Sequence, residues 1–420
     1  MKKLTLVASA VLGLLASGAA MAQSTVTLYG LVDAGYNRVT GLAGGTKNMI
    51  ASGIMEGSKF GMRGTEDIGG GYKAVFTLEG RFEADTGSLS NVPPSGGQLP
   101  DRFVQARYLV PNLPAATQAA LQPVFSGIGA QVGTGVGVNL APQALFDRQA
   151  FVGLVTPVGQ ITAGRQYTPG YIVGASFDAS QTQSSLAAGQ VGSFPPTFDI
   201  RLSNTVQYGI KLDGLTAALM YGAGETAGSS SNGRFYGAMA IYKGDNWSVG
   251  YGYNNRNNRV GAKSLTNNVV GATFDVGPGT IYGQYATIKD ENPDLLEQIR
   301  PGFALAGAAA PLVAAGYRNA LQLDANLYHI GYRMTSGVNT WVVAYSRLDD
   351  KRSNNADTSS YGVTYTYALS KRTNLNAVLV RFNNSGLGQA APGGNGFLGG
   401  VTANAGRDST NIAFGIRHSF

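Results

Sequence analysis

The chain has 420 residues, of which 13% are charged, and its 31 Lys and Arg outnumber its 24 Asp and Glu to give a formal charge of +7. With 60 Gly, 21 Tyr and a mean hydropathy of -0.02, the composition excludes both a disordered chain and a helical membrane protein. The sequence has no Cys and no basic cluster, so it predicts no disulfide framework, no thiolate metal site and no nucleic-acid partner.

The first segment has the pattern of an export signal. Two lysines precede an apolar run over residues 4–15, and the tripeptide ending at Ala22 has the small-x-small form of a signal-peptidase site. The apolar run is shorter than the roughly 20 residues that a spanning helix needs. The sequence therefore predicts a signal peptide over residues 1–22 and one exported domain over residues 23–420.

Segments of alternating apolar and polar residues follow, and each predicts a strand with one apolar face. Seven short connections rich in Gly, Asp, Asn or Pro alternate with eight longer loops, a contrast typical of barrels with short periplasmic turns and long external loops. The predicted fold class is all-β, a 16-stranded antiparallel transmembrane barrel. The sixteen expected strands span residues 25–37, 53–65, 71–84, 146–156, 159–168, 201–212, 215–222, 233–243, 246–254, 266–276, 279–288, 325–335, 338–348, 358–370, 373–383 and 409–420.

Two of the external loops are unusually long. Residues 85–145 are rich in Gly, Ala and Pro, and residues 289–324 include an alanine-rich stretch, 303–315, that suits a short helix. Loops of this length without structure of their own are uncommon in compact domains. We expect the two loops to cover the barrel mouth or to contact a neighbouring subunit, and an additional role in surface adhesion stays open.

The last strand alternates up to a carboxy-terminal aromatic residue. Ile412, Phe414 and Ile416 lie on the same face as Phe420. The final strand of a barrel has to pair with the first, because each unpaired backbone group in lipid costs several kcal/mol. A terminal aromatic residue there resembles the signal read by the barrel-assembly machinery, so Phe420 is predicted to be an assembly signal.

Four segments carry a family resemblance: STVTLYG at 24–30, GSKFGMRGTED at 57–67, RQAFVGL at 148–154 and GIRHSF at 415–420. Together they are similar to the general diffusion porins of Gram-negative outer membranes, specifically the betaproteobacterial type. The resemblance implies a homotrimer in outer-membrane lipid, each barrel forming a water-filled channel for passive diffusion of ions and small hydrophilic solutes. It also implies that the third external loop, residues 169–200, folds inward and narrows the pore.

Inward-facing basic residues are the candidates for the pore constriction, since charged rings are a usual source of pore selectivity. Alternation along the strand turns Arg148 inward if Phe151 faces lipid. A role in lining a polar wall stays open for every candidate. The basic candidates are Lys59, Arg148 and Arg201, which match the family's basic ladder, together with Arg81, added by alternation, and Arg165.

The acidic candidates are fewer. Glu79 is expected on the wall, and the third loop supplies only Asp178 and Asp199, because it lacks the Pro-Glu-Phe-Gly segment of the family's acidic form. The balance of charge at the constriction is therefore expected to be positive. This balance predicts a preference for inorganic anions.

The sequence favours a channel over an enzyme. A catalytic barrel needs a base beside a nucleophile, usually His, and the only histidines are His329 on the wall and His418 on the closing strand. Metal-ligand clusters and nucleotide motifs are not found, so we expect no metal and no cofactor. A substrate-selective channel stays open as an alternative, although a sugar slide would need more inward aromatic residues than Tyr29 and a few others.

Overall fold

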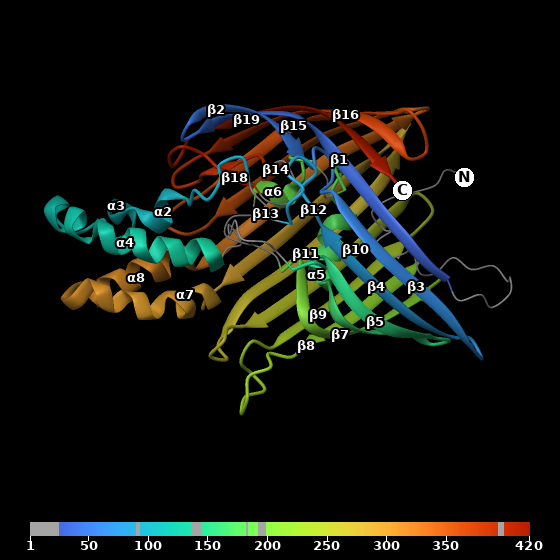
Figure 1. The fold of residues 1–420 in the computed structure, drawn as a ribbon, viewed down its shortest axis with the longest axis horizontal. Helices are drawn as coiled ribbons and strands as arrows, with labels where there is room; N and C mark the ends of the chain where they lie inside the picture. The colour runs from blue at the N-terminus through green and yellow to red at the C-terminus, as the bar shows by residue number, and fades with distance from the viewer. Residues whose placement is uncertain (1–24, 90–92, 136–143, 182–183, 192–198, 394–398) are drawn as a thin grey trace.

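The computed structural model of the chain describes residues 25–89, 93–135, 144–181, 184–191, 199–393 and 399–420. The predicted signal peptide over residues 1–22 lies outside these ranges. The chain forms one twisted sheet closed into a barrel, with helices inside the barrel and at one end of it (Figure 1).

Seventeen strands form the barrel sheet, and consecutive strands pair antiparallel around it. The ring closes because β1 pairs with β19 on one side and with β2 and β3 on the other. The strands are β1 (Thr25–Leu42), β2 (Gly45–Ser52), β3 (Lys59–Gly69), β4 (Tyr72–Arg81), β5 (Gln149–Thr156), β6 (Gly159–Tyr167), β7 (Arg201–Leu212), β8 (Leu215–Gly222), β9 (Phe235–Lys243), β10 (Trp247–Asn257), β11 (Lys263–Val276), β12 (Gly279–Asp290), β13 (Leu323–Ser336), β14 (Asn339–Asp350), β15 (Thr358–Ala368), β16 (Thr373–Asn384) and β19 (Ser409–Ser419).

Two of these strands share one position in the barrel. β2 pairs with the external half of β1, from Ala34 to Leu42, and β3 pairs with the other half, from Thr25 to Leu31. The seventeen strands therefore fill sixteen positions, which confirms the predicted 16-stranded antiparallel barrel. The prediction of a continuous strand over residues 53–65 is wrong in its first half, because the chain leaves the sheet between β2 and β3.

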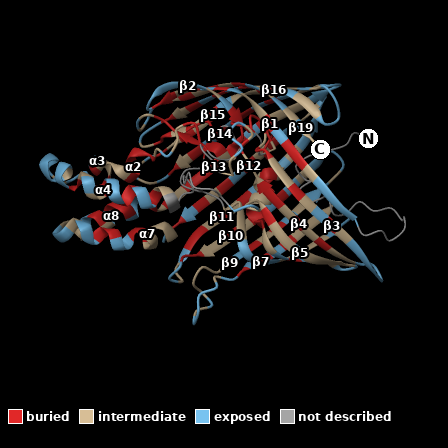
Figure 2. Cartoon of the chain, viewed as in Figure 1, coloured by how far each residue is buried: buried red, intermediate tan, exposed pale blue. Residues whose placement is uncertain are grey.

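The strands form because their two faces meet different surroundings. On β5, Val152 is 61% exposed on the outer face, and Ile161 of β6 is exposed on the same face, opposite Leu154. Thr162, the next residue of β6, is buried on the inner face. Buried and exposed residues alternate in this way along the wall (Figure 2). An apolar outer face and a polar inner face suit a barrel that stands in lipid.

The helices occupy two places (Figure 1). The third external loop carries α5 (Pro169–Ser176) and α6 (Ala188–Val191), and the last external loop carries the short strand pair β17 (Ala390–Ala391) and β18 (Gly400–Val401). The remaining helices project from the external end and are called the hood. They are α2 (Asp101–Val104), α3 (Ala106–Leu109), α4 (Ala115–Gly135), α7 (Asp294–Ile299), η1 (Arg300–Ala309) and α8 (Ala310–Leu321).

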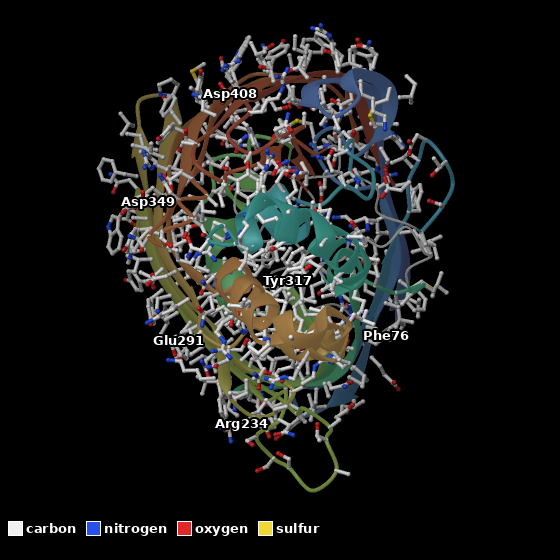
Figure 3. The ribbon with its side chains drawn as sticks, turned by 90° about the vertical axis from the view of Figure 1, so that its left-hand side faces the viewer. Phe76, Arg234, Glu291, Tyr317, Asp349 and Asp408 are labelled. Atoms are coloured by element: carbon white, nitrogen blue, oxygen red, sulfur yellow. The ribbon has the colours of Figure 1, made fainter. Side chains whose placement is uncertain are left out.

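The hood joins the two longest external loops through a hydrophobic core of its own. The ring of Tyr317 stacks on Phe303 at 5.8 Å and packs against Phe125 at 6.0 Å. Its buried hydroxyl donates a 3.0 Å hydrogen bond to the carbonyl of Phe103. Seen from the external end, Tyr317 lies among helices in front of the barrel opening (Figure 3). The alanine-rich stretch 303–315 that suits a helix lies in η1 and α8.

Candidate functional site

The third external loop runs inward from the end of β6 and packs against the inside of the wall. Thr168 begins α5, and its side chain accepts a hydrogen bond from the N–H of Tyr171. After α5, Phe177 lies against β10 and β11 where these strands carry Gly250 and Gly271. A Cβ on Gly271 would lie 2.2 Å from the Phe177 ring. Glycines in the wall therefore provide the space in which this loop lies.

Several hydrogen bonds fasten the loop to the wall, and two that join uncharged groups lie far apart around the barrel. The N–H of Ala179 donates to Nε2 of His329 at 2.9 Å, and Nδ1 of the same ring lies 2.8 Å from the hydroxyl of Ser346. Because Nε2 accepts, the imidazole is neutral and Nδ1 carries the proton. Farther along, the N–H of Ser184 donates to the carbonyl of Met55 at 2.6 Å.

Residues 53–58, called the inward turn, fill the gap between β2 and β3. The buried carboxylate of Asp33 accepts hydrogen bonds from three consecutive N–H groups, those of Ile54 at 3.1 Å and of Met55 and Glu56 at 2.9 Å each. A carboxylate satisfies these buried donors where the sheet ladder no longer does. The turn thereby brings the carbonyl of Met55 within hydrogen-bond distance of the third loop and the carboxylate of Glu56 within reach of Lys59 and Arg417.

Basic side chains from four strands and the residue before β5 face the lumen. Nζ of Lys59 lies 2.5 Å from Oε1 of Glu56, and Arg417 lies 3.5 Å from the other oxygen of this carboxylate. On β4, Arg81 forms a 2.9 Å ion pair with Asp147. Four of the predicted basic residues are called the basic wall: Lys59, Arg81, Arg148 and Arg201. The fifth, Arg165, lies opposite Ala150 in the outward row of β6, so its predicted place at the lumen is wrong.

Arg148 and Arg201 meet at one tyrosine. Nε of Arg148 donates to Glu79 at 2.6 Å, and its Nη2 donates to the hydroxyl of Tyr167 at 2.9 Å. Arg201 donates to the same hydroxyl at 3.1 Å, and its guanidinium lies 4.6 Å from the centre of the Tyr167 ring. Arg165 donates to the backbone carbonyl that precedes Arg148, at 2.6 Å. The wall is thus held in place by hydrogen bonds between its own strands.

The third-loop carboxylates lie elsewhere. Asp178 is 1% exposed and accepts hydrogen bonds from the N–H and hydroxyl of Ser180 and from the N–H of Ala188. Asp199 is buried in a 2.8 Å ion pair with Arg256 of β10. Neither carboxylate forms an ion pair with the basic wall. Glu79, by contrast, lies within the wall, as expected of a wall residue.

One guanidinium of the wall has no ion pair. With Arg417 included, five basic side chains lie near the carboxylates of Glu56, Glu79 and Asp147, each of which already has a basic partner. The buried carboxylates of Asp33 and Glu83 lie close by. Among the residues that the structure describes, Arg201 forms no ion pair, and its guanidinium contacts only the ring and hydroxyl of Tyr167.

A second orientation predicted from the sequence is wrong. Phe151 lies opposite Thr77 of β4, in the row of inward residues that includes Glu79, and therefore faces the lumen. The alternation rule placed Arg148 inward by setting Phe151 outward, but β5 begins only at Gln149. Arg148 precedes the strand, so its side chain reaches Glu79 without following the alternation.

Four further residues belong to the site although the sequence analysis did not select them: Glu56, Asp147, Tyr167 and Arg417. Arg417 shares the inner face of the closing strand, so the alternation pattern contained its signal. Glu56 and Asp147 lie outside strands, where alternation does not predict the direction of a side chain. Tyr167 is distinguished only by its two arginine partners, which come from distant parts of the chain.

The predicted assembly residue lies at the seam of the barrel. Phe420 and Gly30 exchange two backbone hydrogen bonds, each 3.1 Å long. The Phe420 ring covers Gly30 so closely that a Cβ there would lie 2.2 Å from it. The last residue thus extends the pairing between β19 and β1 on the outer face.

Comparisons with known proteins agree with this architecture. A sequence model described as Gram-negative porin matches residues 8–387. Outer membrane porin protein 32 of Delftia acidovorans is 28% identical over 440 residues, covering 100% of both chains. An outer membrane porin protein of Bordetella pertussis is 26% identical over 253 residues, covering 48% of this chain and 65% of its own. Among solved structures, the anion-selective porin from Comamonas acidovorans shares the fold with a TM-score of 0.67 at 22% identity, covering 95% of this chain and 100% of its own.

Proposed function

The chain belongs to the Gram-negative porin family, and we propose that its outer-membrane channel prefers anions because the basic wall forms the constriction. The channel serves passive diffusion of ions and small hydrophilic solutes. In this proposal the four residues of the basic wall attract anions, and Glu79 partly offsets them. Asp178 and Asp199 contribute little, because one is enclosed in the loop and the other is paired with Arg256.

The observation that carries the proposal is a guanidinium without an ion pair in a narrowed lumen. Arg201 forms no ion pair within the described ranges, so its field extends into the water of the lumen. Low-dielectric walls focus such a field and raise the local concentration of counter-ions. The anion selectivity named for the structural relative from Comamonas acidovorans is consistent with this preference.

Salt should weaken the preference. The Debye length is about 30 Å at 0.01 M ionic strength and about 3 Å at 1 M, so concentrated salt screens the basic wall from ions in the lumen. We therefore expect strong chloride preference in dilute KCl and weak preference in concentrated KCl.

The test is the zero-current potential of a planar bilayer across a KCl gradient. Arg201→Gln removes the charge of the basic wall that has no carboxylate partner, and no carboxylate loses its ion pair. Chloride preference is expected in the native channel and a reduced preference in this variant. Arg381→Glu, which changes a basic residue on the outer face of β16, is the control and should keep the native potential. A cation-selective native channel, or an Arg201→Gln channel with the native potential, would contradict the proposal.

We also propose a homotrimer, on the strength of the family relationship. Porin subunits associate through the outer surfaces of their barrels, and the hood extends beyond the single barrel mouth from which it projects. Unheated and heated samples should migrate differently on detergent gels, and light scattering of the detergent complex should give three chains. A monomer in mild detergent would contradict this part of the proposal.

We also propose how the chain is exported and assembled. Cleavage after Ala22 should leave Gln23 as the first residue of the protein isolated from outer membranes, which amino-terminal sequencing measures. Phe420 is proposed to be read by the barrel-assembly machinery. We assign no catalytic step: His329 serves the third loop, and His418 lies at the rim with its Nδ1 2.9 Å from the hydroxyl of Thr373.

A further inference from the structure

A cavity of about 280 Å³ lies along the inner wall between α5 and the short turn after β5. Phe151 on β5, Ile172 on α5 and Met239 on β9 give it an apolar side. The volume is near the lower end of the roughly 300–1,000 Å³ typical of ligand pockets. The space therefore suits one small ring and not a chain of sugars. We call it the side cavity.

The opposite side of the cavity carries the side-chain amides of Gln166 and Gln207, of which the first is fully hydrogen-bonded and the second is not. Oε1 of Gln166 accepts a 2.6 Å hydrogen bond from Thr162, and its Nε2 lies 3.2 Å from the hydroxyl of Thr205. Oε1 of Gln207 is buried and has no hydrogen-bond partner among the described residues. An unpaired buried acceptor is costly, so this oxygen is suited to an O–H or N–H donor that arrives with a ligand.

The side cavity adjoins the cationic part of the constriction. Tyr167 lines it, and the hydroxyl of this residue is the point where Arg148 and Arg201 meet. Lys211 lines the cavity toward the periplasmic end. Positive charge therefore lies at both ends of a partly apolar space, an arrangement that suits a carboxylate attached to a ring.

From this juxtaposition we propose that the side cavity binds small aromatic carboxylates on their way through the channel. The carboxylate lies at Arg148 and Arg201, the ring lies against Phe151 and Ile172, and a ring hydroxyl, where present, donates to Gln207. This inference rests on the proposed function, since it assumes that the lumen conducts anions. A small anion without a ring makes only the electrostatic interaction with the arginines, and a neutral ring makes only the apolar contact with the cavity.

The experiment is block of the chloride current through single channels by benzoate. Acetate supplies the charge alone and benzyl alcohol supplies the ring alone, at the same concentrations. Benzoate should interrupt the native current where neither control does, and 4-hydroxybenzoate should act at lower concentration than benzoate. Phe151→Ala should raise the half-blocking concentration of benzoate about tenfold, the loss expected when one ring face no longer contacts apolar surface.

Two matched variants separate the possible outcomes. Val152→Ala changes the adjacent residue on the lipid-facing side and should leave the block unchanged. Arg148→Gln should raise the half-blocking concentration of benzoate, because the carboxylate loses one of its two cationic partners. The inference is overturned if native channels conduct chloride and benzoate does not block them, or if benzoate blocks Phe151→Ala channels at the same concentration as native ones. Native channels that fail to conduct, or that select cations, would instead refute the proposed function.

Discussion

Replacing Asp33 should release the inward turn, because this one carboxylate satisfies three buried N–H groups. In Asp33→Ala the three donors lose their acceptor, and each buried donor left unpaired costs about 1–3 kcal/mol. Water from the lumen can reach part of the released turn, so the low end of this range applies. We expect the free energy of unfolding to fall by about 3 kcal/mol, about 1 kcal/mol for each donor.

Asp33→Asn is the matched control for this prediction. Its side-chain oxygen still accepts from one or two of the N–H groups, but its amide nitrogen accepts none and the charge is lost. The loss should be about 1 kcal/mol, between the native chain and the alanine variant. Urea titration of the refolded barrel, followed by the fluorescence of Trp247 and Trp341, measures all three proteins.

The current through the channel supplies a second measurement. When the turn is released, Glu56 no longer has a fixed position beside Lys59 and Arg417, so the open current should become noisier. If Asp33→Ala unfolds at the native urea concentration and conducts as quietly as the native chain, the carboxylate does not hold the turn, and the reasoning fails.

Three more predictions concern the seam and the hood. Deleting Phe420, or substituting Gly30→Ala beneath its ring, should reduce the amount of barrel inserted in cells while leaving the conductance of inserted channels unchanged. Tyr317→Phe removes the buried hydrogen bond from the Tyr317 hydroxyl to the Phe103 carbonyl and should speed external proteolysis of the hood, with a loss of about 1–3 kcal/mol in local stability and no change in barrel unfolding. Burial acts to raise the pKa of Asp294, but hydrogen bonds from Arg259 outweigh it and hold the pKa below the usual range. These bonds therefore stabilise the hood at pH values above the pKa of Asp294 in the unfolded chain. Their contribution is lost as the pH falls through the pKa of Asp294 in the folded chain. Hydrogen exchange in α7, corrected for its intrinsic rate, should therefore accelerate below about pH 4 in the native chain, and Arg259→Gln should remove most of this pH dependence.

The sequence predicts the strands well because lipid on one side and water on the other impose a period of two. The same reasoning fails where a contact from a distant part of the chain replaces the sheet ladder. Ile54 and Met55 are adjacent apolar residues, so they break the period of two, and Gly53 and Gly57 lie on either side of them. These local signals indicate an interruption of the strand, but they do not show that the carboxylate of Asp33 on β1 holds the turn inside the barrel.

The candidate site was predictable to a similar degree. The resemblance and the alternation together identified five basic residues. Four of them lie at the lumen, and Arg165 lies in the outward row of β6. Their partners were not predictable, since Tyr167 meets Arg201 only after the whole third loop has folded inward. The hood is a further example, because Phe125 and Tyr317 belong to loops almost two hundred positions apart and their packing has no counterpart in local pattern.

The third loop is fastened by neutral bonds and by charged ones. The bonds from Ala179 to His329 and from Ser184 to Met55 join neutral groups, so dissolved ions do not screen them. The contacts of Arg333 with the carbonyl of Ala179 and of Arg256 with Asp199 involve charge, and salt weakens these. The size of the largest solute admitted should therefore depend on salt less than the selectivity between anions and cations does. A cell that moves between fresh water and brine would keep its size limit more nearly constant than its discrimination between anions and cations.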